Sequence, residues 1–239
     1  MDKIDNWDFL WSKYLSFLRD WCILIFLIRR GNKETFRRLR KVDENHRGFD
    51  SHSTICNTLR TKNFEQSVKL PAGKDECDWI SMYSVEFYNQ LVIFFGTIEE
   101  FCSKESCPHM CAGQGFKYLW EDGNRYTKPT DLPANQYISL LFDWADAMLG
   151  DPSYFPKDRS AKYMSSFKNE AKKILRRFLR VYAHIFHHHY AQIKHTGGGS
   201  YFKNSFRHFY YFVKEFDLIK DNEFEPLQEM IATLVKRPN

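Results

Sequence analysis

Residues 171–190 read AKKILRRFLRVYAHIFHHHY, and this stretch decides the fold. Its apolar residues recur at three- and four-residue spacing, which predicts one helix with an apolar stripe facing a core. A core helix with a solvated basic face is the plainest interpretation. The stretch also carries two polar sets, the arginines Arg176, Arg177 and Arg180 and the histidines His184, His187, His188 and His189.

A pair of cysteines upstream extends the interpretation of the histidines. Cys102 and Cys107 flank a short polar stretch, CSKESC, just after an apolar helix. Two cysteines and two histidines make up the ligands of a structural Cys2His2 zinc site. The two pairs lie much further apart than the dozen or so residues of a DNA-reading finger. A metal ion here would instead tie two distant parts of one domain together.

The composition bounds the class of protein. A chain of 239 residues suits one domain, or one domain with a tail, and an aromatic content of 17% allows a sizeable core. A net charge of +5 does not by itself indicate a nucleic acid partner. Six cysteines without regular spacing do not form a disulfide framework. They fit a reducing compartment, with some of them as metal ligands.

The most hydrophobic run, WCILIFLI at residues 21–28, is shorter than the twenty or so residues of a membrane span. Acidic residues precede this run, and Arg29 and Arg30 follow it. This order of charges is the reverse of a signal peptide. We therefore expect a soluble, intracellular chain without stable membrane insertion. An N-terminal helix lying at a membrane interface is the alternative.

Patterning along the chain predicts an all-α bundle with one β-hairpin. Residues 1–54 are expected to form an N-terminal extension, apolar and helical at 1–31 and a mobile linker at 32–54. Residues 55–239 are expected to form the folded domain. Asp122-Gly123 between aromatic runs predicts the hairpin, at Phe116–Thr127. The predicted longer helices are the central buried Trp79–Phe101 with Asp75 or Asp78 as its cap, Asn135–Leu149, Lys168–Tyr190, Asn204–Phe216 with Ser205 as its cap, and Glu223–Leu234 with Pro226 in its first turn.

Several segments together resemble the Mob (Mps one binder)/phocein family of zinc-containing kinase coactivators and adaptors. The segments are DWISMYSVEFYNQLVIFFGTIEEFC, ESCPHMCAG, KYLWEDG with KPTDLPANQYISLLFDW, ILRRFLRVYAHIFHHHY, and NSFRHFYYFVKEFDLI with EFEPLQEMI. They cover most of the chain from about residue 57 to residue 235. The resemblance implies a four-helix bundle core with peripheral short helices and one hairpin. It also implies a structural zinc ion, held by Cys102, Cys107, His184 and His189.

Helix geometry and the resemblance disagree about the fourth zinc ligand. In a regular helix, residues five apart differ by about 140° around the axis, whereas His184 and His188 differ by about 40°. Spacing alone therefore selects His188. The resemblance selects His189, because family members carry other residue types at the two positions before it. We follow the resemblance, and infer that the helix ends or distorts near Phe186.

An enzymatic function is not expected. Four protein ligands close a zinc site and leave no position for a catalytic water. A zinc hydrolase built on His184-x-x-x-His188 is the alternative. It would need a glutamate between the two histidines as general base, and Ile185 and Phe186 occupy those places.

The resemblance also implies two binding surfaces. Arginines grouped on one helix face suit a phosphate, and the matching family positions, Arg176, Arg177 and Arg180, bind phosphothreonine peptides from an upstream sterile-20-like kinase or its scaffold. A second surface binds the basic N-terminal region of an NDR/LATS-type AGC kinase. Family members that bind these kinases usually carry Glu where this chain has Lys74, and a lysine would repel a basic partner. The matching positions of this surface are Lys74, Asp78, Trp79, Glu86 and His208.

Thr58 matches a family threonine that the upstream kinase phosphorylates, and its phosphorylation would release the N-terminal segment from the kinase-facing surface. The expected protein is a non-enzymatic, zinc-stabilised adaptor in a Hippo-like or mitotic-exit network. It would be cytoplasmic, with the nucleus, spindle pole or cell cortex as further locations. The first alternative is a divergent Mob adaptor that scaffolds phosphatase or vesicle-trafficking complexes. Nucleic acid binding through the basic helix is the other, and no reading motif supports it.

Overall fold

The computed structural model describes residues 37–58 and 63–234. The predicted helix at 1–31, with its run WCILIFLI, lies outside these residues. The chain divides into two units after Arg37, and all elements described below belong to the second unit. The predicted boundary at residue 54 stays a prediction, and residues 38–54 include the start of a helix and contacts to the helical core. None of the described helices is both long and apolar enough to cross a lipid bilayer.

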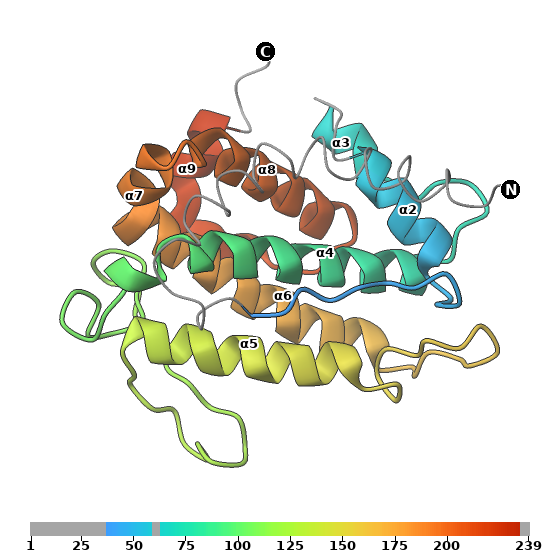
Figure 1. Ribbon diagram of the computed structural model, residues 1–239, viewed down its shortest axis with the longest axis horizontal. Helices are drawn as coiled ribbons and strands as arrows, with labels where there is room; N and C mark the ends of the chain where they lie inside the picture. Colours follow the sequence, from blue (N-terminus) through green and yellow to red (C-terminus); the bar gives the residue numbers. More distant parts are fainter. Residues whose placement is uncertain (1–36, 59–62, 235–239) are drawn as a thin grey trace, which may run out of the picture. The chain divides into compact units, whose positions relative to one another are not determined.

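Helix α4 (Glu76–Gly96) is the buried centre of the fold (Figure 1). Asp75 caps it, because a side-chain oxygen accepts a hydrogen bond of 2.9 Å from the backbone N–H of Asp78. Every residue from Trp79 to Tyr88 is buried, so neighbours pack on all sides of this helix. The prediction of a central buried helix is confirmed. It ends earlier than predicted, and a separate 3-10 turn, η1 (Glu99–Phe101), follows it.

The elements in the described part of this unit are helices, and four of them pack on α4. Helices α2, α5, α6 and α8 contact α4, α5 contacts α6, and α3 contacts α8. The four-helix bundle that the resemblance implies stays a prediction. The remaining bounds are α2 (Phe49–Thr58), α3 (Phe64–Ser67), α5 (Ala134–Gly150), α6 (Phe167–His184), η2 (Ile185–His189), α7 (Tyr190–His195), α8 (Gly199–Glu215), η3 (Asp221–Leu227) and α9 (Gln228–Leu234).

The predicted β-hairpin at Phe116–Thr127 is not formed as a pair of strands. Isolated antiparallel bridges take its place, one of which joins Trp120 to Thr130. These two residues exchange both backbone hydrogen bonds at 2.8 Å. The ladder stops there because the N–H of Tyr118 bonds to the carbonyl of Met110 at 2.8 Å. The Tyr118 N–H, which a longer hairpin would need for its next hydrogen bond, is therefore bonded to a third segment instead.

The turn predicted at Asp122-Gly123 is present between Trp120 and Thr130. Gly123 has φ of +75°, a conformation that glycine adopts without steric cost. The N–H of Asp122 bonds to the carbonyl of Tyr126 at 3.0 Å, and the Asp122 carboxylate accepts the N–H groups of Asn124 and Tyr126 at 2.9 Å each. The sequence thus predicted the reversal of the chain correctly, and the strands on either side of it wrongly.

Helix α8 begins at Gly199, earlier than the predicted start at Asn204. The predicted cap Ser205 therefore lies inside the helix, where its hydroxyl contacts the Tyr182 hydroxyl at 2.6 Å. The break predicted at 197–199 lies at residues 196–198, between α7 and α8, and Gly197 within it has φ of +80°. At the end of the domain, Pro226 lies in the 3-10 helix η3 rather than in the first turn of α9.

The segment before α2 lies against α4 and α5. The side-chain amide of Asn89 accepts the N–H of Arg40 at 2.8 Å and donates to the Arg40 carbonyl at 2.9 Å. The Arg40 guanidinium pairs with the Asp146 carboxylate at 2.6 Å. One amide on α4 thus satisfies both backbone groups of Arg40. This segment belongs to the predicted mobile linker, and in the structure it is anchored to the helices.

Candidate metal centre and basic pocket

Four metal-ligand side chains from two distant parts of the chain converge in the core. Cys102 and Cys107 lie at the start of the loop after η1, and His184 and His189 lie at the ends of α6 and η2. All four residues are buried, and their donor atoms lie within 4.8 Å of one another. The Cys102 sulfur is 3.5 Å from Nε2 of His184, and the Cys107 sulfur is 3.3 Å from Nε2 of His189.

A π-helical turn brings the two histidines to the same face. Residues Ile185–His189 form η2, in which hydrogen bonds join residues five apart. Residues five apart therefore lie one above the other, as residues four apart do in an α-helix. The distortion inferred near Phe186 is this turn. His188, which regular helix geometry selected, is exposed and points its Nε2 to the Cys111 sulfur at 3.3 Å.

The electrostatic environment keeps both imidazoles neutral. Burial lowers the pKa of His184 to about 3 and that of His189 to about 4. Burial also raises the pKa of the Cys102 thiol. Neutral imidazoles are the form that binds metal, whereas the thiol protons would have to leave when a cation binds. The Nδ1 of His184 lies 2.8 Å from the Cys111 carbonyl, so His184 donates there and presents Nε2 to the sulfurs.

The four donors fit a zinc ion. Bonds of about 2.3 Å to sulfur and about 2.1 Å to nitrogen, at a tetrahedral angle, place the two donor atoms about 3.6 Å apart. The sulfur–nitrogen separations of 3.5 and 3.3 Å are close to this value. The four residues could therefore hold a metal ion with little movement, and the ion would join the loop after η1 to the end of α6.

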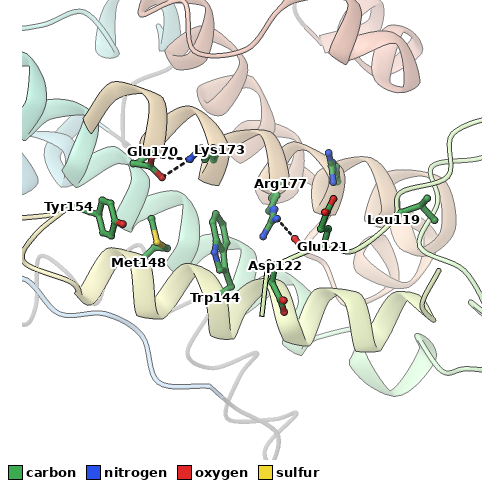
Figure 2. A pocket seen from close by; sticks show the side chains of 11 residues that line it. Leu119, Glu121, Asp122, Trp144, Met148, Tyr154, Glu170, Lys173 and Arg177 are labelled. Carbon is green, nitrogen blue, oxygen red and sulfur yellow. Dashed lines mark hydrogen bonds and ion pairs between the residues drawn. The ribbon is translucent and has the colours of Figure 1, made fainter. Parts of the chain in front are cut away.

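A pocket of about 490 Å³ lies beside α6, between α5 and the turn at Asp122-Gly123 (Figure 2). Arg177 is at its centre, with its guanidinium carbon 4.4 Å from the ring centre of Trp120 and 4.1 Å from that of Trp144. Its Nη2 donates to the Glu121 carbonyl at 2.7 Å. Its Nη1 is buried and has no hydrogen-bond partner among the described residues.

The three predicted phosphate-binding arginines do not all face this pocket. Arg177 and Arg180 line it, and Arg180 donates to the Tyr137 hydroxyl at 2.7 Å. Arg176 instead pairs with Glu223 of η3 at 3.0 Å and is not among the lining residues. Arg176 and Arg177 point in different directions because adjacent residues on a helix are about 100° apart, and the phosphate-binding role of the three arginines stays a prediction.

Lys173 is the cation that the sequence interpretation missed. It precedes Arg177 by one helical turn, lines the pocket, and pairs with Glu170 at 2.9 Å (Figure 2). The signal was present in the spacing, because Lys173, Arg177 and Arg180 are four and three residues apart. The position of the pocket comes from Trp120 and Trp144, which lie far away in the sequence.

The predicted kinase-facing residues divide into two ring side chains of the core and three charged side chains. Trp79 is fully buried and donates to the Val68 carbonyl at 2.9 Å. His208 is 1% exposed, and its Nε2 lies 3.0 Å from the Tyr83 hydroxyl. These two side chains are therefore core residues, and their effect on a partner would be to position the surface above them.

The charged residues of the set lie on α4 and the turn before it, and of these Glu86 is buried. Lys74 is half-buried in that turn. Asp78 pairs with Arg47 at 2.6 Å, and Glu86 lies 4.0 Å from His52 of α2. Residues 46–58 thus face both predicted acidic residues. Thr58 is the last residue of α2, and its side chain lies outside the described residues.

The fold and the site together define an all-helical domain whose buried Cys2His2 cluster could hold a structural metal ion. The chain belongs to the Mob1/phocein family, whose sequence profile matches residues 56–227. The resemblance found in the sequence is thereby confirmed.

Relatives in plants and animals match over most of the chain. MOB kinase activator-like 1A of Arabidopsis thaliana is 36% identical over 204 residues, covering 85% of this chain and 95% of the relative. Human MOB kinase activator 3A is 36% identical over 211 residues, covering 87% and 97%. MOB kinase activator-like 3 of Drosophila melanogaster is 39% identical over 174 residues, covering 73% and 79%. The family is thus one of kinase activators rather than of enzymes.

Proposed function

We propose that this chain is a non-enzymatic adaptor that binds and activates or scaffolds an NDR/LATS-type AGC kinase. The observation that carries the proposal is its membership of a family whose matched relatives are named kinase activators. The closed Cys2His2 cluster supports a structural role for its metal, since four protein ligands leave no position for a catalytic water.

The bound metal in this proposal is zinc, which would supply a rigid cross-link between the loop after η1 and the end of α6. Cys102 and Cys107 would hold it from the loop, and His184 and His189 from the helix. The His184 hydrogen bond to the Cys111 carbonyl orients one ligand for this task. The cross-link would fix the start of the segment that leads through Trp120 to the basic pocket.

The pocket on α6 would bind a phosphothreonine peptide from an upstream sterile-20-like kinase or scaffold. Arg177 supports this assignment, because its Nη1 is buried without a hydrogen-bond partner and its guanidinium plane is fixed by two indole rings. A phosphate oxygen would satisfy that donor with a charge-assisted hydrogen bond. Arg180 and Lys173 would add charge, and the phosphate would compete with Glu170 for Lys173.

The kinase segment would lie along α4, where Asp78 and Glu86 supply the acidic character that a basic partner needs. The test is a pull-down of the full chain with the basic N-terminal segment of an NDR/LATS-type kinase. Lys74→Glu should strengthen that interaction, because it removes a repulsive charge from the surface. Binding that is absent in both the wild type and Lys74→Glu would overturn the kinase assignment.

A second candidate function is favoured by the charges on this surface. Lys74 is cationic, and Asp78 already has a cationic partner within the chain, Arg47. Both features weaken the attraction for a basic kinase segment. The alternative is an adaptor that does not bind these kinases and scaffolds phosphatase or vesicle-trafficking complexes. The same pull-down distinguishes the two, since this alternative predicts no capture of the kinase segment by either form.

A further inference from the structure

A second group of metal-ligand side chains lies where α2 packs on α4. His52 and Cys56 come from α2, and Glu86 comes from α4. One ligand atom from each lies within 4.8 Å of the other two. The Cys56 sulfur is 3.8 Å from Nε2 of His52, and Oε2 of Glu86 is 4.0 Å from the same nitrogen. These three residues share no member with the Cys2His2 cluster.

The local sequence explains why the three side chains meet. His52 and Cys56 are four residues apart on α2, so they lie one above the other on one face. Ile55, on the same helix, is fully buried and helps to hold that helix against its neighbours. Glu86 belongs to the continuous buried run of α4 and is 9% exposed. A carboxylate at such a position requires a partner, because burying an uncompensated charge is costly.

We propose that His52, Cys56 and Glu86 form a second metal site, which binds a thiophilic divalent cation of the zinc type and ties α2 to α4. Imidazole, thiolate and carboxylate together are a ligand set that zinc accepts. Binding would release the Cys56 thiol proton to solvent, because the thiolate is the ligand. Three protein ligands leave a fourth position for water, so the ion should exchange more readily than one in a closed site.

The two oxygens of the Glu86 carboxyl group have different neighbours. Its Oε1 accepts a hydrogen bond of 2.8 Å from Gln90, and its Oε2 is 4.0 Å from Nε2 of His52. A divalent ion between Oε2 and the imidazole would stabilise the Glu86 carboxylate.

The geometry needs only a small adjustment to hold an ion. Tetrahedral zinc places sulfur and nitrogen donors about 3.6 Å apart, and oxygen and nitrogen donors slightly closer. The Cys56 sulfur is 3.8 Å from Nε2 of His52 and 3.9 Å from its Nδ1, so the imidazole must rotate to aim one nitrogen at the ion. Such rotation about the terminal side-chain torsion of histidine is soft.

The test uses the full chain, loaded with one equivalent of Zn²⁺ and then titrated with Co²⁺ as a spectroscopic probe. A second equivalent should bind and produce a thiolate-to-cobalt charge-transfer band, while zinc measured by plasma mass spectrometry stays at one equivalent. Cys56→Ser should abolish the band. Cys77→Ser is the matched control, because Cys77 is a half-buried cysteine of α4 outside the group, and it should keep the band.

A second measurement separates metal binding from misfolding of a variant. Hydrogen exchange of the α2 amides should slow at least fivefold on Co²⁺ addition in the wild type, and should not change in His52→Gln. The circular dichroism spectra of Cys56→Ser and His52→Gln should match that of the wild type. A wild type without the cobalt band, or a band that survives in Cys56→Ser, would overturn the proposal. Neither result depends on kinase binding.

Discussion

The Nε of Arg47 donates a hydrogen bond of 2.6 Å to the Oδ1 of Asp78. Tyr163 supports this ion pair, because its hydroxyl donates to the same carboxylate oxygen at 2.9 Å and its ring lies 4.5 Å from the Arg47 guanidinium carbon. The Asp78 carboxylate, which is expected to contact a basic partner, is therefore already paired with a cation, Arg47, from the segment before α2. A partner would have to displace that cation, and this exchange offers a way to control the surface.

Replacing Arg47 by Gln should strengthen binding of a basic kinase segment, by about threefold to tenfold at low salt, because the Asp78 carboxylate loses its internal cation. The gain should shrink as salt is added, since it comes from partly exposed charges. Isothermal titration at two ionic strengths measures both effects. Arg159→Gln, which removes an exposed arginine, is the control for net charge. Weaker binding by Arg47→Gln would contradict the competition.

Replacing His189 by Gln should lower the zinc content by one ion per chain, and the thermal midpoint by more than about 5 °C, because a ligand of the buried cluster is lost. His188→Gln should change neither quantity, since His188 is exposed and lies beside Cys111. Metal analysis with differential scanning calorimetry provides both readouts. The reverse pattern would assign the fourth ligand to His188.

Replacing Arg177 by Lys should weaken binding of a phosphothreonine peptide about tenfold. Lysine keeps the charge, but it lacks the planar fork that two indole rings hold in place. Arg176→Lys should change the affinity less than twofold, because Arg176 is paired with Glu223 outside the pocket. Fluorescence anisotropy with the phosphorylated and unphosphorylated peptides gives the comparison. Equal losses in the two variants would restore the arginine set derived from the sequence.

The buried His208 predicts a loss of stability in acid. Burial lowers its pKa to about 3, so the folded chain keeps it neutral while the unfolded chain takes up a proton below about pH 6.5. Its contribution is therefore fully present above pH 6.5 and declines as the pH falls toward 3. Between pH 7 and 5 it accounts for about 2 kcal/mol.

His208→Phe keeps an aromatic ring beside Tyr83 and Phe87 and removes this titration. The free energy of unfolding of the wild type should fall between pH 7 and pH 5. That of His208→Phe should fall by about 2 kcal/mol less over the same range. Urea denaturation at the two pH values measures the difference, and the other histidines cancel in the comparison. Identical pH dependence of the two proteins would show that burial does not lower the pKa of His208 below its value in the unfolded chain.

Most helices followed from the apolar pattern, because each buries a face that the pattern marks. The start of α8 did not follow from this pattern. Gly199 can adopt a helical or an irregular conformation, and only packing decides which of the two it adopts. The strands at 116–127 also failed, since the donor of Tyr118 goes to Met110, a partner that no local signal announces. Sequence patterns record which residues are buried, and they do not record which segment accepts a given hydrogen bond.

The site was predicted unevenly for the same reason. The cysteines and His184 follow from ligand chemistry, while His189 required the family resemblance, because η2 departs from the helical period on which spacing arguments rest. Three cations on α6 were expected to act together, and this role stays a prediction. The pocket beside α6 is lined by Arg177, Arg180 and Lys173, and two indole rings from other parts of the chain hold Arg177 there.

The π-turn at Ile185–His189 makes this part of the chain sensitive to length rather than to composition. Phe186, His187 and His188 lie between the two buried histidines without being in the cluster, so many side chains should be tolerated there. Deleting one of them would leave a regular helix in which the second histidine follows His184 by four residues, about 40° away around the axis, so the two imidazoles would still share one face. Inserting a residue would instead rotate the second imidazole by about 100° away from that face. Insertions should therefore be excluded from these five residues even where substitutions accumulate.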